Sequence, residues 1–417
     1  MTASSARQPA LGFIFVTLLL AMLGGGLVIP VLPGLVTEFQ GGNVAEGAHG
    51  YGWIAGVFAL MQFIGSPIIG ALSDRYGRRR VLLISLAGSS IDYVIMALAP
   101  SLGWLFVARM ISGLTAAVLA TVNAYVADVT PPEKRAQAFG LVGAAVGLGF
   151  VIGPVVGGLL GQIDLRLPFW AAAGFAALNG IYGAWVLPES LPPEKRRAFD
   201  WRRANPLGAL LALRRFPVVF GLAGTHFIFW VAQTLLHATW VIYTGYRYGW
   251  TPGQVGASFA LVGFCSALVQ AVLVRRVLPW LGETRAIVIG CSITIAAYVA
   301  YGVATEGWIV YIIIVGASFA GIAGPALQAY ISRHSPANEQ GAVQGAFAGL
   351  TSVASVVGLP LGAWSFGWAV EPGSPVPLGI AFFEGAALMA LALALAVRSF
   401  RRDAATGPAE VNPRAPA

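Results

Sequence analysis

Long apolar runs, separated by short polar segments, follow one another along almost the whole chain. Each run is long enough to cross about 30 Å of hydrocarbon as a helix. The twelve runs lie near residues 11–33, 50–72, 80–99, 103–127, 136–160, 167–187, 216–244, 251–274, 284–303, 307–330, 338–366 and 375–397. A backbone in lipid must satisfy its own hydrogen bonds, and these runs are too long and continuous for barrel strands. The pattern predicts an all-α integral membrane protein with twelve transmembrane helices.

The longest polar interruption, residues 188–215, is rich in Pro and Arg and leaves six apolar runs on either side. Its composition is typical of a linker at a membrane surface. We therefore expect an N-terminal six-helix bundle over residues 1–187 and a second six-helix bundle over residues 216–397. Residues 398–417 are expected to form a disordered tail.

The two halves repeat at a constant offset of 205 residues, which places Gly77 on Gly282 and Arg80 on Arg285. The same offset matches Ala124–Tyr125 with Ala329–Tyr330, Pro131 with Pro336, Gly140 with Gly345, Gly153 with Gly358 and Gly157 with Gly362. Equivalent loops fall on the same membrane side, so the halves are parallel repeats. Secondary transporters use such repeats to rock two bundles around a central site.

Composition and charge support this class. The chain is 57% hydrophobic and 10% charged, so it cannot hide its apolar surface in a soluble core. All but three of its 25 Lys and Arg residues lie on one side of the predicted bundle. The positive-inside rule makes that side cytoplasmic, with both termini there, in the inner (plasma) membrane. The basic charge therefore reflects topology and lipid contact, and does not indicate nucleic-acid binding.

A dense polar segment, residues 70–80, joins the second and third runs and contains Asp74, Arg75 and Arg78. One interpretation is a loop that only sets topology. Another is a gate, because the Asp74 carboxylate can accept hydrogen bonds from a facing helix N-terminus and Arg78 can reach Asp128. Such a set is expected to hold when the cytoplasmic side is closed and to break when it opens. We predict Asp74, Arg75, Arg78 and Asp128 as gating residues.

Two ionisable residues lie inside apolar runs. A charge such as that of Arg109 costs about 2.5–3.5 kcal/mol at the centre of a membrane helix, so it needs a polar interior, a partner or a nearby interface. Asp92 is the clearest buried acid, and burial favours the protonated form that a proton carrier must adopt. We predict both for proton coupling, and Asp92 also for substrate binding; a satisfied structural carboxylate is the alternative.

Neutral polar and aromatic residues also occur inside the runs. Gln62, Gln270 and Gln328 are candidates for substrate binding, and hydrogen bonding between helices is an equally good interpretation. The aromatic residues Phe227, Phe229, Trp230 and Trp240 suit a flat ligand, core packing or lipid contact.

Small residues recur every fourth position in the fifth run, at Gly149, Gly153 and Gly157, and Pro154 lies among them. This ridge predicts close packing on a neighbouring helix, with a kink at the proline. Cys265 and Cys291 have no metal-like spacing, so we expect them to pack, with no metal site.

These segments together resemble the major facilitator superfamily, and within it the tetracycline-resistance-type drug:proton antiporters. GALSDRYGRRR from Gly70, RMISGLTAA from Arg109 and GLGFVIGPVVGG from Gly147 resemble three signatures of that superfamily. Further similar segments are ALMQF (59–63), SIDYVIMA (90–97), YVADVTPPEKR (125–135) and GPALQ (324–328). The resemblance implies a gating role for the first signature and a role in proton transfer for Arg109.

The chain also departs from the tetracycline exporters. Those exporters carry an Asp in helix 1, a His in helix 8 and an Asp in helix 9, where this chain has Leu20, Ser266 and Thr294. Possible substitutes are His226, His237 and Glu384. A lipophilic or amphipathic substrate other than tetracycline is therefore equally compatible.

The sequence thus predicts a secondary active transporter, a functional monomer that exports a small molecule such as a drug in exchange for protons. No cofactor is expected, only the proton as coupling ion. Alternatives are a metabolite facilitator or importer without proton coupling, and a receptor that does not transport. An enzyme is not expected, because no cofactor fingerprint or nucleophile and base spacing occurs.

Overall fold

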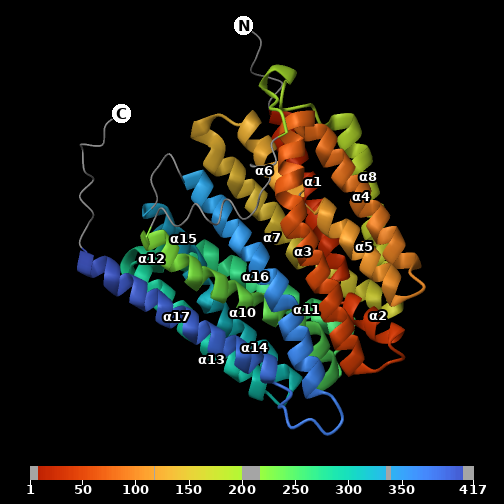
Figure 1. Cartoon of the computed structure of the whole chain (residues 1–417), viewed down its shortest axis with the longest axis vertical. Helices are drawn as coiled ribbons and strands as arrows, with labels where there is room; N and C mark the ends of the chain where they lie inside the picture. Colours follow the sequence, from red (N-terminus) through yellow and green to blue (C-terminus); the bar gives the residue numbers. More distant parts are fainter. Residues whose placement is uncertain (1–7, 117, 200–216, 335–339, 407–417) are drawn as a thin grey trace.

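The computed structural model describes residues 8–116, 118–199, 217–334 and 340–406, and its regular structure is helical throughout these ranges. The helices form two bundles, one from each half of the chain, that lie side by side (Figure 1). This confirms the predicted all-α fold. The predicted linker from residue 200 to 215 and the predicted tail from residue 407 lie outside the described residues.

The N-terminal bundle contains the first six predicted spans, the first and fourth of them in two pieces. Its helices are α1 (Gln8–Val28), α2 (Leu32–Phe39), α3 (Val44–Tyr76), α4 (Arg78–Leu98), α5 (Leu102–Thr115), α6 (Val118–Val129), α7 (Arg135–Ile163) and α8 (Leu167–Val186). The run predicted at 11–33 is interrupted between α1 and α2 because Pro30 cannot donate a backbone hydrogen bond and disfavours helical geometry before it.

The C-terminal bundle contains the other six spans, two of which include irregular turns. Its helices are α10 (Pro217–Tyr248), α11 (Pro252–Leu268) with a π-helical turn (Val269–Val274) and α12 (Arg275–Leu281), α13 (Glu283–Val303), α14 (Gly307–Ser318) with a 3-10 turn (Phe319–Ile322) and α15 (Ala323–Arg333), α16 (Gln340–Ala369) and α17 (Ile380–Thr406). The tail predicted to be disordered from residue 398 instead continues α17 to Thr406.

Eleven of the spans in the described residues are both long and apolar enough to cross a membrane. The twelfth, α8, has 20 residues and includes the polar Asn179. Asn179 is fully buried, and its side-chain amide donates to the carbonyl of Thr17 in α1 at 2.8 Å. The residue that lowers the hydropathy of α8 therefore also fastens this helix to its own bundle.

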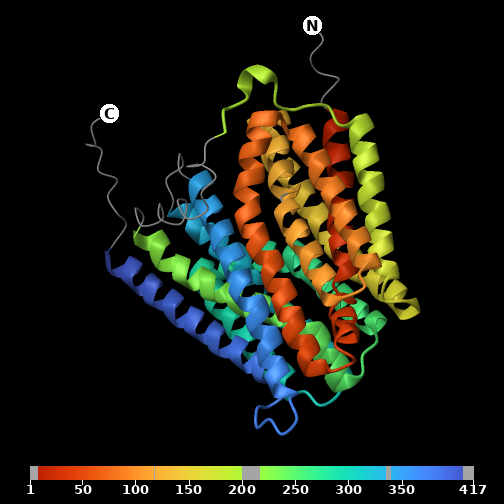
Figure 2. The ribbon, with the colours of Figure 1, turned by 45° about the vertical axis from the view of Figure 1, so that its right-hand side comes forward.

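The two bundles touch mainly through two helix pairs, α3 with α16 and α7 with α11. Trp364 Nε1 of α16 donates to the carbonyl of His49 at 3.2 Å, and Gln162 Nε2 of α7 donates to Thr251 Oγ1 at 3.1 Å. These contacts lie at the end of the molecule away from the start of α1 and the end of α17. We call the end with the start of α1 and the end of α17 the terminal side, and the bundles diverge toward it (Figures 1 and 2).

The glycine ridge of α7 lies against α1 of the same bundle. A Cβ at Gly149 would lie 2.5 Å from the Cβ of Met22, and one at Gly153 would lie 2.7 Å from the Cα of Gly26. Such distances leave no room for a side chain, so only glycine allows this approach. Pro154 stands within the continuous helix α7, and its carbonyl faces Gly256 of α11 in the other bundle.

We predict that Gly157→Ala destabilises the N-terminal bundle, because the added Cβ would lie 2.7 Å from the Cα of Leu27. Overpacking of this kind costs about 1–3 kcal/mol. The matched control is Gly147→Ala on the same helix, where a Cβ meets nothing within 4 Å. Thermal unfolding of the purified variants in detergent measures the difference, and equal melting temperatures would contradict the packing role.

Candidate functional site

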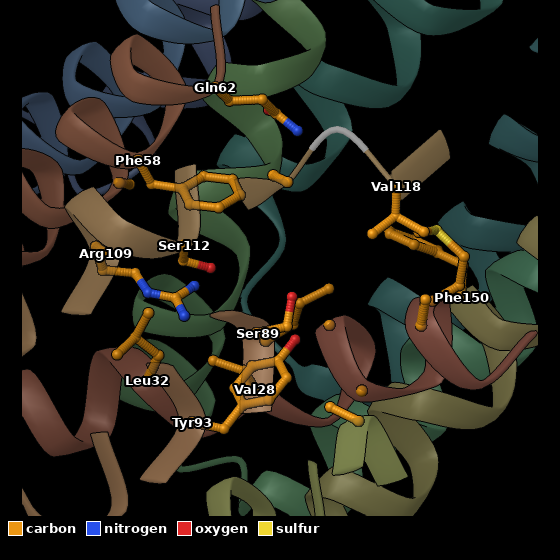
Figure 3. A pocket seen from close by; sticks show the side chains of 18 of the residues that line it. Val28, Leu32, Phe58, Gln62, Ser89, Tyr93, Arg109, Ser112, Val118 and Phe150 are labelled. Carbon is orange, nitrogen blue, oxygen red and sulfur yellow. The ribbon is translucent and has the colours of Figure 1, made fainter. Parts of the chain in front are cut away.

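A cavity with two adjoining lobes lies between the bundles. The first lobe has a volume of about 370 Å³ and is lined largely by α1, α3, α4 and α5; we call it the N-lobe (Figure 3). The second has about 380 Å³ and is lined largely by α10, α11, α13 and α14; we call it the C-lobe. Phe150, His237 and Phe259 line both lobes, so the two are direct neighbours. Each volume is within the range of sites for drug-sized molecules.

A buried ion pair forms the wall of the N-lobe. Arg109 Nη2 of α5 donates to Asp92 Oδ2 of α4, and the Asp92 side chain is completely buried. The structure thus brings together the two residues predicted for proton coupling. Arg109 lines the lobe and Asp92 does not, so the carboxylate lies behind the guanidinium in this structure, and its role in substrate binding stays a prediction.

Polar groups around Arg109 complete the N-lobe. Figure 3 shows the guanidinium of Arg109 near Ser112, with the amide of Gln62 further along the same cavity. The guanidinium also lies 5.3 Å from the centre of the Phe58 ring, a cation–π contact that stabilises a cation. Gln62 is therefore placed where the sequence predicted a substrate contact.

The C-lobe is aromatic and formally neutral apart from His237. Phe229, Trp230 and Trp240 line it, and Tyr298 donates its hydroxyl proton to the side chain of Gln233. Ser266 and Thr294 lie in this lobe and Leu20 lies in the N-lobe. The three positions where tetracycline exporters are expected to be ionisable are thus all on the cavity wall, and all are neutral here.

Other predicted substrate residues lie elsewhere. Gln328 donates to the side-chain oxygen of Gln344 in α16 at 2.5 Å, so it serves helix contact, the other interpretation left open by the sequence. Gln270 is exposed within the π-helical turn and lines neither lobe.

Of the residues suggested as substitutes for the missing ionisable groups, some line the cavity and others do not. His237 lines both lobes. His226 instead makes a hydrogen bond with Thr351 Oγ1 of α16 at 2.9 Å, and neither it nor Glu384 lines a lobe. Phe227 also lies outside both linings.

The predicted gating residues meet on the terminal side. Arg78 Nη1 lies 2.6 Å from Asp74 Oδ1, and its Nε lies 3.2 Å from Asp128 Oδ2. Arg75 instead lies over the ring of Tyr76. All these contacts belong to one bundle and persist while the terminal ends of the bundles diverge. The expectation that this set breaks when that side opens stays a prediction.

Glu189, a residue that the sequence analysis missed, lies at the N-terminus of α4. Its carboxylate accepts from the backbone N–H groups of Arg78 at 2.8 Å and Arg79 at 3.4 Å. It also lies against Gly77, whose φ of +100° favours glycine. The start of the linker is held there too, because the N–H of Arg197 donates to the carbonyl of Asp74 at 3.1 Å. The feature of the sequence that could have indicated Glu189 is its position directly after Pro188, at the end of the sixth apolar run.

The cavity combines one cation, several hydroxyl and amide groups and many aromatic rings. Among the described residues, no Asp or Glu lines either lobe, and no group of three His, Cys, Asp or Glu side chains is placed to bind a metal ion. Such a wall suits a flat amphipathic molecule held by ring contacts and a few hydrogen bonds.

Comparisons with known proteins agree with this architecture. The family model for the Major Facilitator Superfamily matches residues 14–359. The chain is 41% identical to the class C tetracycline resistance protein of Escherichia coli over 84% of this chain and 87% of the relative. It is 28% identical to multidrug resistance protein 2 of Bacillus subtilis over 85% of this chain and 88% of the relative.

Solved structures share the fold. The human organic anion transporter MFSD10 superposes with a TM-score of 0.69 at 26% identity, covering 94% of this chain and 99% of that one. An inward-facing bacterial homologue of the lysosomal transporter Spinster superposes with a TM-score of 0.74 at 16% identity, covering 98% of this chain and 100% of that one. The chain belongs to the Major Facilitator Superfamily and, within it, to the family of the tetracycline resistance proteins.

Proposed function

We propose that this chain is a multi-pass inner-membrane transporter that exports an amphipathic drug, such as tetracycline or a related compound, in exchange for protons. It acts as a monomer, and its terminal side faces the cytoplasm. The names of the relatives support drug efflux, and the neutral C-lobe extends the substrate range beyond tetracycline.

The buried Asp92–Arg109 pair is the observation that carries this proposal. The pair is neutral overall while the carboxylate is ionised. A proton on Asp92 would remove the partner of Arg109 and leave a net positive charge on the wall of the N-lobe. That charge repels a cationic drug, so for an amphipathic substrate that carries a positive charge the proton and the substrate exclude each other, as exchange requires.

The orientation proposal rests on charge. Arg75, Arg78, Arg276 and Arg333 all lie near the terminal side, and the loop between α16 and α17 contains no Lys or Arg. A bias of Lys and Arg toward one side marks the cytoplasmic face.

We predict that Asp92→Asn lowers proton-driven drug efflux at least about 10-fold, because the amide cannot release a proton and leaves Arg109 unneutralised. Efflux by the wild type should collapse when a protonophore dissipates the gradient. Drug transport into everted membrane vesicles measures both effects.

The matched control for Asp92→Asn is Glu384→Gln, which removes an acid from α17 outside both lobes and should retain efflux. Wild-type transport at an unchanged rate without a gradient would exclude proton exchange. Equal losses in the two variants would show that Asp92 has no special role.

We predict that a membrane-impermeant thiol reagent labels Ser374→Cys in intact cells but leaves Arg276→Cys unlabelled until the cells are opened. The two residues lie on opposite sides of the bundle, and Ser374 is in the loop between α16 and α17. Both variants are made after Cys265→Ser and Cys291→Ser. The reverse labelling pattern would place the terminal side outside the cell.

A further inference from the structure

Two ion pairs occupy equivalent positions in the two halves, with their signs exchanged. In the N-terminal bundle, Arg78 at the start of α4 pairs with Asp128 near the end of α6. In the C-terminal bundle, Glu283 at the start of α13 pairs with Arg333 at the end of α15. The repeat offset of 205 residues places Arg78 on Glu283 and Asp128 on Arg333.

The backbone around the two pairs is the same. Gly77 precedes Arg78 with a φ of +100°, and Gly282 precedes Glu283 with a φ of +73°. Each glycine allows a sharp reversal between two long helices, so each pair joins a helix start to the end of the next span. The repeat has therefore kept the geometry of this ion pair and inverted its polarity.

In each pair one side chain is more exposed than its partner. The more exposed side chain is an acid in the N-terminal bundle and a base in the C-terminal bundle. Asp128 is 26% exposed against 12% for Arg78, and Arg333 is 69% exposed against 14% for Glu283. Their helices flank the gap between the bundles at the terminal side (Figure 1). Val118 of α6 lines the N-lobe and Gly324 of α15 lines the C-lobe, so the starts of both helices border the central cavity and their ends lie on the terminal side of it.

We infer that Asp128 and Arg333 form an ion pair between the bundles when the terminal side closes. This inference rests on the proposed transport cycle, in which that side must open and close. Two halves of equal polarity would present two like charges to each other across the gap, which opposes closure. The exchanged polarity instead presents a carboxylate to a guanidinium.

The new contact needs no existing pair to be lost. It links the four side chains in the alternating order Arg78, Asp128, Arg333 and Glu283. If either existing pair is lost, its inner member can still bind across the gap, and the outer member, Arg78 or Glu283, is stabilised by another interaction. Arg78 also contacts Asp74 at 2.6 Å, and Glu283 is the first residue of α13, where the helix dipole favours an acid.

Two other cations lie near Asp128. Arg197 lines a pocket with Asp74, Arg78 and Asp128, and Arg135 is already engaged. Arg135 at the start of α7 donates to the carbonyl of Thr130 at 3.3 Å and to that of Ala127 at 3.2 Å. Ser190 donates to Asp128 Oδ2 at 3.2 Å, which orients the carboxylate without neutralising it. The Asp128 side chain is 26% exposed, which leaves its carboxylate accessible to a cation from the facing bundle.

Cross-linking tests whether the two residues meet. In a background with Cys265→Ser and Cys291→Ser, the purified D128C/R333C variant should be trapped by a short bifunctional thiol reagent. The control D128C/R276C should not be trapped. Arg276 belongs to α12, and the repeat offset does not match it with Asp128. Absence of D128C/R333C trapping overturns the inference.

A pair reversal separates this role from a structural one. R333E should lower the ratio of closed to open molecules about 5-fold, because it replaces attraction by repulsion. E283R/R333E restores the pair inside the C-terminal bundle but leaves two acids facing each other, so closure should stay impaired. Recovery of the wild-type ratio in E283R/R333E would show that Arg333 serves only its own bundle.

Distances between spin labels at Q137C and Q340C, on the first turns of α7 and α16, give this ratio. R276Q removes a cation from the same side and should leave the ratio unchanged. These measurements need neither drug nor gradient, so they can fail while efflux is intact, and they can succeed in a protein that exports nothing.

Discussion

A charge inside a hydrocarbon layer is costly unless a partner or a polar environment lies beside it, and the pair of Asp92 and Arg109 satisfies this constraint. The pair requires α4 and α5 to pack closely, and Gly88 of α4 supplies the space. A Cβ there would lie 2.7 Å from Cγ2 of Thr115. The same packing turns the guanidinium of Arg109 to the N-lobe and keeps Asp92 behind it. Helix packing thus determines which half of a neutral pair the substrate meets.

Most of the fold could be predicted from the sequence, because each membrane span must be a continuous apolar segment. The missed features have local causes. Pro30 divides the first span, and the basic end of α17 remains helical beyond the apolar run. The direction in which a side chain points within a span was harder to predict from the sequence. Gln62 and Gln328 look alike in sequence, yet one lines the cavity and the other bonds to Gln344, since only the packed neighbours decide this.

The candidate site shows the same division. Asp92 and Arg109 could be singled out because each is costly in lipid, and their burial makes a pair necessary. Glu189 could not be found in this way. It lies in a polar segment where an acid is unremarkable, and only the approach of the linker to the start of α4 gives it a role. The Asp74 carboxylate, which was expected to accept hydrogen bonds from a facing helix N-terminus, is engaged by Arg78 instead.

The residues proposed for proton coupling and for the gate share one helix. Arg78 is the first residue of α4, and Asp92 lies 14 residues further along it, about 21 Å at 1.5 Å per residue. The helix is uninterrupted between them. A change in the pairing of Asp92 that shifts α4 against α5 must therefore also shift Arg78, and with it Asp128 at the gap between the bundles. No chain of intermediate side chains is needed for this coupling, because a rigid helix transmits the displacement directly.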